Sequence, residues 1–192
     1  MRNGIVGMVA ICGLCAAASA QQIFDPNLIT LQHDFEGMGA PPAGPFTLGN
    51  ATFSEASTGS GGPGWRVLGG FFNGGDTLTD NAGISDITID FDTPMGAAGL
   101  LVGIGPGTYE VSFYNTGGGL LGTVTGSVAG TLDNFFAGWG HGGGIGSINI
   151  IETTGDNGLV GGIDDVRYDI VPAPGSLALL GLAGFAGTRR RR

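Results

Sequence analysis

The chain has 192 residues, a formal net charge of −9 and no lysine, and 41 of its positions are glycine. Nucleic acids and anionic lipid surfaces need a cationic footprint, so this balance excludes them as partners of the body of the protein. Aromatic and branched apolar residues are spread along the chain, which favours a turn-rich β protein over a disordered one.

Residues 1–20 have the pattern of a secretory signal peptide. A basic residue, Arg2, precedes an apolar stretch over 5–18, and the segment closes with Ala18-Ser19-Ala20 before Gln21. This order of basic start, apolar run and small-x-small site is what signal peptidase recognises. We therefore expect cleavage after Ala20 and export across the inner membrane.

Both cysteines, Cys12 and Cys15, lie in this leader. The body therefore has no thiol for a disulfide, a metal site or catalysis. A lipoprotein interpretation stays open, but Ile11 and Leu14 stand where a small residue normally precedes a lipidated cysteine. We prefer ordinary cleavage.

Residues 21–170 amount to roughly 150 residues, which suits one domain. They carry all sixteen acidic residues against two arginines, Arg66 and Arg167, for a formal charge of −14. This charge permits cations or neutral glycans as partners, and it is also explained by solubility alone.

Alternating apolar and polar residues predict strands in this body, for example at Ile87-Thr-Ile89-Asp-Phe91. Glycine clusters separate the runs. Further strands are expected at 28–35, 46–53, 65–68, 97–104, 109–113, 120–125, 135–139, 147–152 and 166–170. Some ten short strands at this spacing predict an all-β fold, an antiparallel β-sandwich or jelly roll.

Four acidic residues are candidate ligands of Ca²⁺. Asp34 and Glu36 lie near the first strand, and Asp164 and Asp165 lie at the start of the last. The first and last strands of a jelly roll often approach one another, and Ca²⁺ takes six to eight hard oxygen ligands. The alternative is that they are solvated carboxylates or turn caps. Loop acids such as Asp76 lack calcium-loop spacing and are interpreted as Asx turns.

Three aromatic residues are candidates for binding sugar rings: Trp65, Tyr114 and Trp139, with Asn115 and His141 close in sequence to the last two. An exposed ring stacks on the apolar face of a sugar while neighbouring polar groups bond its hydroxyls. The alternative is that each ring belongs to the core or to a strand edge.

Catalysis has little support in the sequence. The body lacks lysine and cysteine, and His33 and His141 are far apart without zinc-site spacing. A carboxylate pair is able to hydrolyse glycosidic bonds, but a chain with sixteen acids always contains such pairs. We expect a non-enzymatic protein.

Residues 171–192 form a separate tail. Val171-Pro172-Ala173-Pro174-Gly175 is followed by an apolar run over 176–187 and by four terminal arginines, Arg189, Arg190, Arg191 and Arg192. As a helix the run would be about 18 Å long, short of the ~30 Å hydrocarbon core. The arginines act as a membrane stop and stay cytoplasmic. The tail therefore predicts a short hydrophobic helix that inserts transiently, with the body on the far side.

This order of Val-Pro-x-Pro, apolar run and arginine cluster resembles the PEP-CTERM sorting tail, with Pro-Ala-Pro in place of Pro-Glu-Pro. The resemblance implies recognition and cleavage by an exosortase-type membrane protease, followed by release to the cell surface or matrix in association with exopolysaccharide. The body, from Phe35-Glu36-Gly37 to Ile163-Asp164-Asp165-Val166, resembles extracellular jelly-roll modules that often precede such tails. A purely structural surface protein is the main alternative, and a carboxylate-based glycan hydrolase is a distant one.

Overall fold

The computed structural model describes residues 19–39, 41–56, 64–71, 75–80, 86–103, 105–130, 133–155 and 161–171. Over these ranges the protein is all-β and all strand pairs are antiparallel, which confirms the predicted fold class of the body. No helix in them is long and apolar enough to cross a membrane. The predicted signal helix and tail helix lie outside the described residues.

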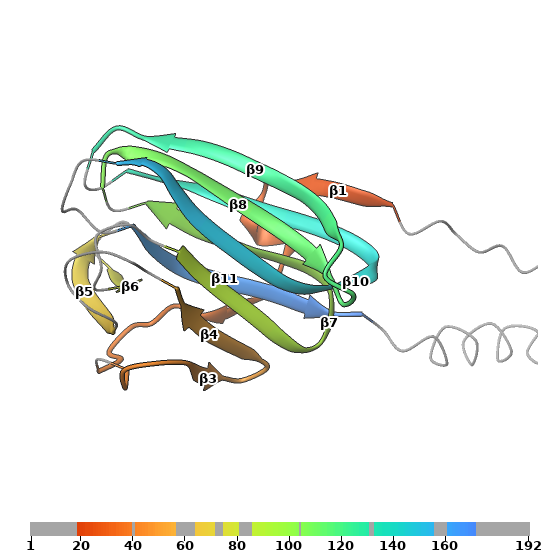
Figure 1. The fold of residues 1–192 in the computed structure, drawn as a ribbon, viewed down its shortest axis with the longest axis horizontal. Helices are drawn as coiled ribbons and strands as arrows, with labels where there is room; N and C mark the ends of the chain where they lie inside the picture. Colours follow the sequence, from red (N-terminus) through yellow and green to blue (C-terminus); the bar gives the residue numbers. More distant parts are fainter. Residues whose placement is uncertain are drawn as a thin grey trace, which may run out of the picture.

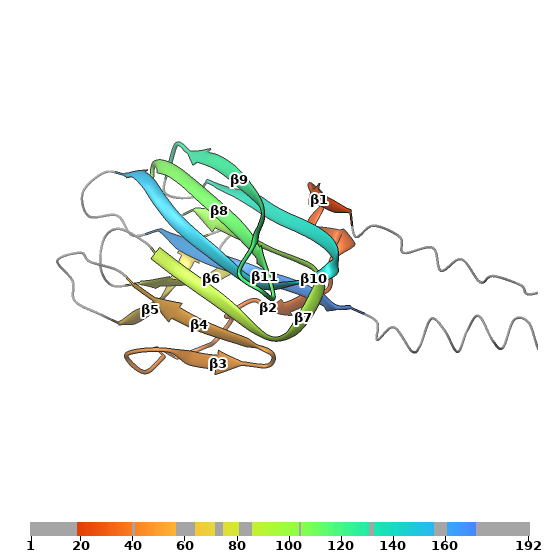
Figure 2. The ribbon, with the colours of Figure 1, turned by 45° about the vertical axis from the view of Figure 1, so that its right-hand side comes forward.

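The elements are, in chain order, β1 (Ala20–Ile23), a 3-10 helix η1 (Pro26–Leu28), β2 (Leu31–His33), β3 (Phe46–Leu48), β4 (Ala51–Glu55), β5 (Trp65–Phe71), β6 (Gly75–Asp80), β7 (Asp86–Gly103), β8 (Gly107–Asn115), β9 (Leu120–Val128), β10 (Asn134–Gly155) and β11 (Gly162–Ile170). Figures 1 and 2 show the β8–β9 hairpin on one side of the molecule and the β3–β4 hairpin on the other.

Two long strands, β7 and β10, organise the fold because each takes part in two sets of pairings. The first half of β7 pairs with β4 and with the second half of β10, which continues to β8 and β9. The second half of β7 pairs with β11 and with the first half of β10. The pairing of β7 with β10 breaks between Gly140 and Ile145, so the sheet bends there and its two halves form a sandwich-like arrangement.

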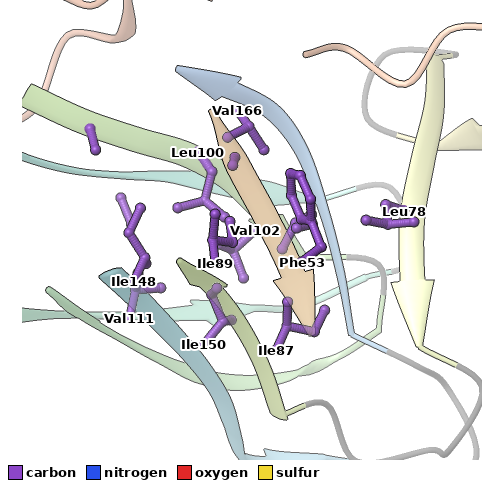
Figure 3. Close-up of a cluster of buried hydrophobic side chains, with 14 of the residues drawn as sticks. Phe53, Leu78, Ile87, Ile89, Leu100, Val102, Val111, Ile148, Ile150 and Val166 are labelled. Carbon is purple, nitrogen blue, oxygen red and sulfur yellow. The ribbon is translucent and has the colours of Figure 1, made fainter. Parts of the chain in front are cut away.

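Both halves contribute to one hydrophobic core. Figure 3 shows Leu100 and Val166 from one half converging on Ile89, Val111 and Ile148 from the other. All five side chains are fully buried. Burial of a side chain of this size contributes about 1.5–3 kcal/mol to stability, so this cluster is the main reason why the two halves stay together.

Two glycines on β9 make room for aromatic rings from β10. A Cβ atom at Gly126 would lie 2.6 Å from the ring of Phe135, and a Cβ at Gly122 would collide with the ring of Trp139. The ring of Trp139 also stacks on Phe113, with centroids 5.8 Å apart. Part of the high glycine content thus serves close packing between strands and not only turns.

The predicted strands differ from the observed ones in where they begin and end. The run predicted at 46–53 is a hairpin, β3–β4, which turns at Gly49 with a φ of 56°. The run predicted at 28–35 begins at the last residue of η1 and contains only a short strand, β2. β7 and β10 each unite two predicted strands.

Candidate functional site

Acidic side chains gather where the loop after β2 meets the starts of β6 and β11. The loop is held by Phe35, whose side chain is only 4% exposed and packs edge-on against Phe53 at 5.8 Å between centroids. Phe35 has a φ of 56°, in the left-handed region that non-glycine residues rarely adopt. Burial of this ring therefore fixes a strained turn and, with it, the flanking Asp34 and Glu36.

Two hydrogen bonds between side chains and backbone join Glu36 and Gly37 to Asp76. The backbone N–H of Asp76 donates to Oε1 of Glu36 at 3.0 Å, and the N–H of Gly37 donates to Oδ2 of Asp76 at 2.9 Å. Because these residues are about forty positions apart in sequence, the pair joins the loop to β6. Asp76 therefore does not form the local Asx turn expected for it.

Glu36 and Asp164 occupy the space beside Gly75. A Cβ atom at Gly75 would lie 2.5 Å from Oε1 of Glu36 and 3.7 Å from Oδ2 of Asp164. Glycine thus leaves room for the carboxylate of Glu36 in its present position, and a Cβ atom here would displace it. No larger side chain at this position would leave the arrangement of the two carboxylates unchanged.

Asp164 is the most buried acid of the cluster, at 5% exposure. Its pKa is raised to about 7, and desolvation by burial is the largest cause. The N–H of Asp165, which donates to its Oδ1 at 2.7 Å, opposes the rise, and the negative charges of Asp165, Glu36 and Asp34 add to it. A cation placed here would relieve the repulsion.

The structure thus places the other three predicted calcium ligands, Asp34, Glu36 and Asp165, close enough to Asp164 for their charges to act on it. Asp165 has a φ of 48°, and its Oδ2 is already engaged in a 3.0 Å ion pair with Arg167. Asp76 also joins the cluster. Asp76 lies in β6, directly before the alternation Thr77-Leu78-Thr79, which is the sequence signal for this strand.

The cluster fits a divalent cation in charge but not in ligand number. Ca²⁺ prefers carboxylate and carbonyl oxygens. Across the described ranges, however, no three His, Cys, Asp or Glu side chains are placed to hold one ion. A bound cation would have to draw the carboxylates of Glu36 and Asp164 together.

The three candidate aromatics lie in different places. Trp65 is 5% exposed and its indole N–H donates to the carbonyl oxygen of Gly44 at 2.9 Å. Trp139 lies between strands over Gly122, so both tryptophans pack with the core. Tyr114 is partly exposed on β8 and is not part of the core cluster, so part of its ring is accessible to a ligand.

Most sorting and cleavage residues lie outside the described residues: Ala18, Pro172, Ala173, Pro174, Gly175 and the four terminal arginines. Ala20 and Gln21 pair with His141 and Gly140 as the start of β1. The N–H of Val171 donates to the carbonyl oxygen of Pro94 at 3.2 Å. β1 therefore begins, and β11 ends, at the same end of the molecule (Figure 1).

No protein-family model and no curated protein matches the chain. Among solved structures it is similar to the K1 cleaved adhesin domain of Lys-gingipain from Porphyromonas gingivalis W83, with 11% identity, 79% of this chain and 98% of that one covered, and a TM-score of 0.44. It is also similar to the enzymatically active domain of tailspike protein 4 of bacteriophage CBA120, with 11% identity, 77% and 22% covered, and a TM-score of 0.42.

A third similar structure is the arabinose-bound α-L-arabinofuranosidase MgGH51, with 10% identity, a TM-score of 0.38, and 73% of this chain and 26% of that one covered. The chain therefore spans about a quarter of the arabinofuranosidase and less of the tailspike domain. None of these similarities assigns a function to it.

Proposed function

We propose that the chain is an exported cell-surface or extracellular-matrix protein, sorted through its PEP-CTERM-like tail and associated with exopolysaccharide. The observation that carries this proposal is the order of features in the last 22 residues, from Val171 to Arg192, combined with the signal-peptide pattern of residues 1–20. Each feature alone is common. Their order is specific, because the arginines orient the segment and its short apolar run suits temporary retention.

The folded body supports this proposal in two ways. Its hydrophobic core is formed by residues between Phe35 and Tyr168, all of which precede the tail in sequence. The end of β11 leads directly into the tail at the edge of the domain (Figure 2). An extracellular jelly-roll module before a cleavable anchor has this organisation.

Processing is tested by intact-mass measurement of the protein recovered from its native host. The expected species begins at Gln21 and lacks the residues beyond about Pro174. A mature protein that retains Arg192 would contradict cleavage of the tail.

The role of the tail charge is tested by replacing the four terminal arginines with serine. Loss of the cytoplasmic stop should abolish membrane retention and reduce processing. Replacement with lysine is the matched control, because it preserves the charge and should preserve both. Equal behaviour of the serine and lysine forms would argue against an oriented anchor.

Association with glycans is tested by pull-down with polysaccharide purified from the host matrix. Binding is expected. A correctly processed protein that binds no polysaccharide would instead be the purely structural surface protein. Release of new reducing ends from the bound glycan would contradict the non-enzymatic role and favour the hydrolase.

A further inference from the structure

A cavity of about 410 Å³ lies where the β8–β9 turn meets the bends of β7 and β10. Its volume is within the range of roughly 300–1,000 Å³ typical of small-molecule sites. It is separate from the acidic cluster and shares no residue with it. The lining residues that matter below are Asp90, Asp92, Asn115, Thr116, Gly146 and Ser147.

A β-bulge shapes this cavity. The pairing of β10 with β8 shifts between Ile145 and Ser147, so Gly146 is the extra residue there. On the other side of β10, residues 91–94 of β7 have no partner on β10. A Cβ atom at Gly146 would lie 2.8 Å from Cα of Thr116 and 3.0 Å from the carbonyl oxygen of Asn115. Only glycine allows this close contact of β10 with the turn, and bulges often re-aim side chains beside binding sites.

Asn115 is oriented by its own turn. Its Oδ1 accepts hydrogen bonds from the N–H groups of Gly117 at 2.8 Å and Gly119 at 2.9 Å. Two backbone donors on one atom identify it as the oxygen, which leaves the amide NH₂ group as the free end. Asn115 therefore offers a pre-positioned hydrogen-bond donor.

Asp90 and Asp92 supply acceptors. In the part of the chain that the structure describes, neither carboxylate forms a hydrogen bond or an ion pair. Ser147 pairs directly with Asp90 on one side and with Tyr114 on the other. Directly opposed residues project from the same face of a sheet, so Asp90, Ser147 and Tyr114 form a row that leads from the cavity to the partly exposed ring of Tyr114.

This combination selects between classes of ligand. Two carboxylates repel phosphate, sulfate and uronate groups. A cation would meet the NH₂ group of Asn115, because the amide oxygen is already used by the turn. A neutral sugar has hydroxyl groups that both donate to carboxylates and accept from an amide, and an apolar ring face that stacks on an aromatic.

We propose that this cavity binds a sugar residue of a neutral glycan, with Tyr114 as a stacking platform for the adjoining residue. Asp90 and Asp92 accept hydrogen bonds from sugar hydroxyls and Asn115 donates one. This inference rests on the proposed association with exopolysaccharide and names the surface that carries it.

The test measures binding by isothermal titration calorimetry to hexasaccharides of glucose, mannose and galactose, with an alginate hexasaccharide as the anionic counterpart. The full mature body is used. We expect binding to at least one neutral hexasaccharide and none to alginate. Absence of binding to every neutral probe, or preference for alginate, would overturn the inference.

Variants locate the site. N115D keeps an oxygen for Gly117 and Gly119 but replaces the donor with a carboxylate, so it should weaken binding about tenfold or more, the effect of about one lost hydrogen bond. D90N and Y114L should weaken it as well. D133N is the matched control, because it removes an exposed charge before β10 and away from the cavity, and it should bind like the unmodified protein.

The outcomes separate this inference from the proposed function. Unchanged affinity in N115D, D90N and Y114L, in a protein that still binds matrix polysaccharide, would overturn the cavity and leave the function standing. Calcium binding that is strengthened by N115D and lost in D90N would show a cation site and overturn it too. Thermal unfolding of each variant confirms that the fold is intact.

Discussion

The indole ring of Trp139 on β10 lies against Gly122 on β9, in the space that a side chain at position 122 would occupy. The same ring also stacks on the ring of Phe113, which lies on β8. This contact joins the β8–β9 hairpin to the first half of β10, so residue size at position 122 affects how the two halves of the sandwich pack.

Gly122→Ala should therefore destabilise the protein by about 1–3 kcal/mol, because overpacking displaces the ring. Urea unfolding measures this change. Gly39→Ala is the control, since a Cβ atom there meets nothing within 4 Å, and it should be nearly neutral. Trp139→Phe should recover part of the loss in the Gly122→Ala background, and purely additive effects of the two changes would argue against the contact.

The buried Asp164 makes stability depend on pH. An unfolded aspartate has a pKa of about 3.9, whereas the pKa of Asp164 is raised to about 7 in the folded protein. Between these values the folded state holds a proton that the unfolded state lacks, so the free energy of unfolding falls as pH rises from about 4 to about 7 and then levels off.

Asp164→Asn should remove this dependence, because the amide stays neutral and its oxygen still accepts from the N–H of Asp165. At pH 8 the variant should be more stable than the unmodified protein by on the order of 2 kcal/mol. Urea unfolding at pH 5 and pH 8 gives the comparison. The same slope with pH in both proteins would show that Asp164 does not titrate as described.

If the acidic cluster binds Ca²⁺, the ion should offset the loss of stability at high pH. Ca²⁺ would favour the ionised form of Asp164, so it should raise the melting temperature at pH 8, and chelation should lower it again. Glu36→Gln should weaken the response, whereas Asp133→Asn should keep it. A melting temperature that is insensitive to both Ca²⁺ and chelator removes the proposal.

Arg167 ties the N-terminal segment to β11. Its guanidinium group donates to the carbonyl oxygens of Pro26 and Ile29, each at 3.4 Å, and pairs with Asp165 at 3.0 Å. Arg167→Ala should cost about 1–3 kcal/mol and increase hydrogen exchange in residues 24–33. Asp165→Asn removes only the charge and should cost less. Unchanged exchange in Arg167→Ala would contradict the tie.

Alternation of apolar residues was enough to predict most strands and the antiparallel all-β class. It could not predict that β7 and β10 run through their bends. Pro94 normally indicates the end of a strand, because proline cannot donate to a ladder. Here residues 91–94 make no ladder pairs with β10, whose register is broken opposite them, so Pro94 removes no hydrogen bond to that strand.

Part of the acidic cluster was also predictable from the sequence. Asp34, Glu36 and Asp164 come together because the first and last strands of such folds approach one another, which sequence position alone indicates. Asp76 was missed because Gly75 and its neighbours have a loop-like composition. The cavity beside Asn115 was also missed, since it depends on a bulge at Gly146 that no local pattern indicates.

The position of β11 has a mechanical consequence. This strand is the last of the body, yet it lies inside the sheet, with β7 on one side and β6 and β2 on the other. Tension applied through its end at Ile170 acts along the strand and loads its hydrogen bonds to β7 and to β2 and β6 in shear rather than peeling them apart singly. A pull on this strand must therefore break several hydrogen bonds at once before the domain unfolds.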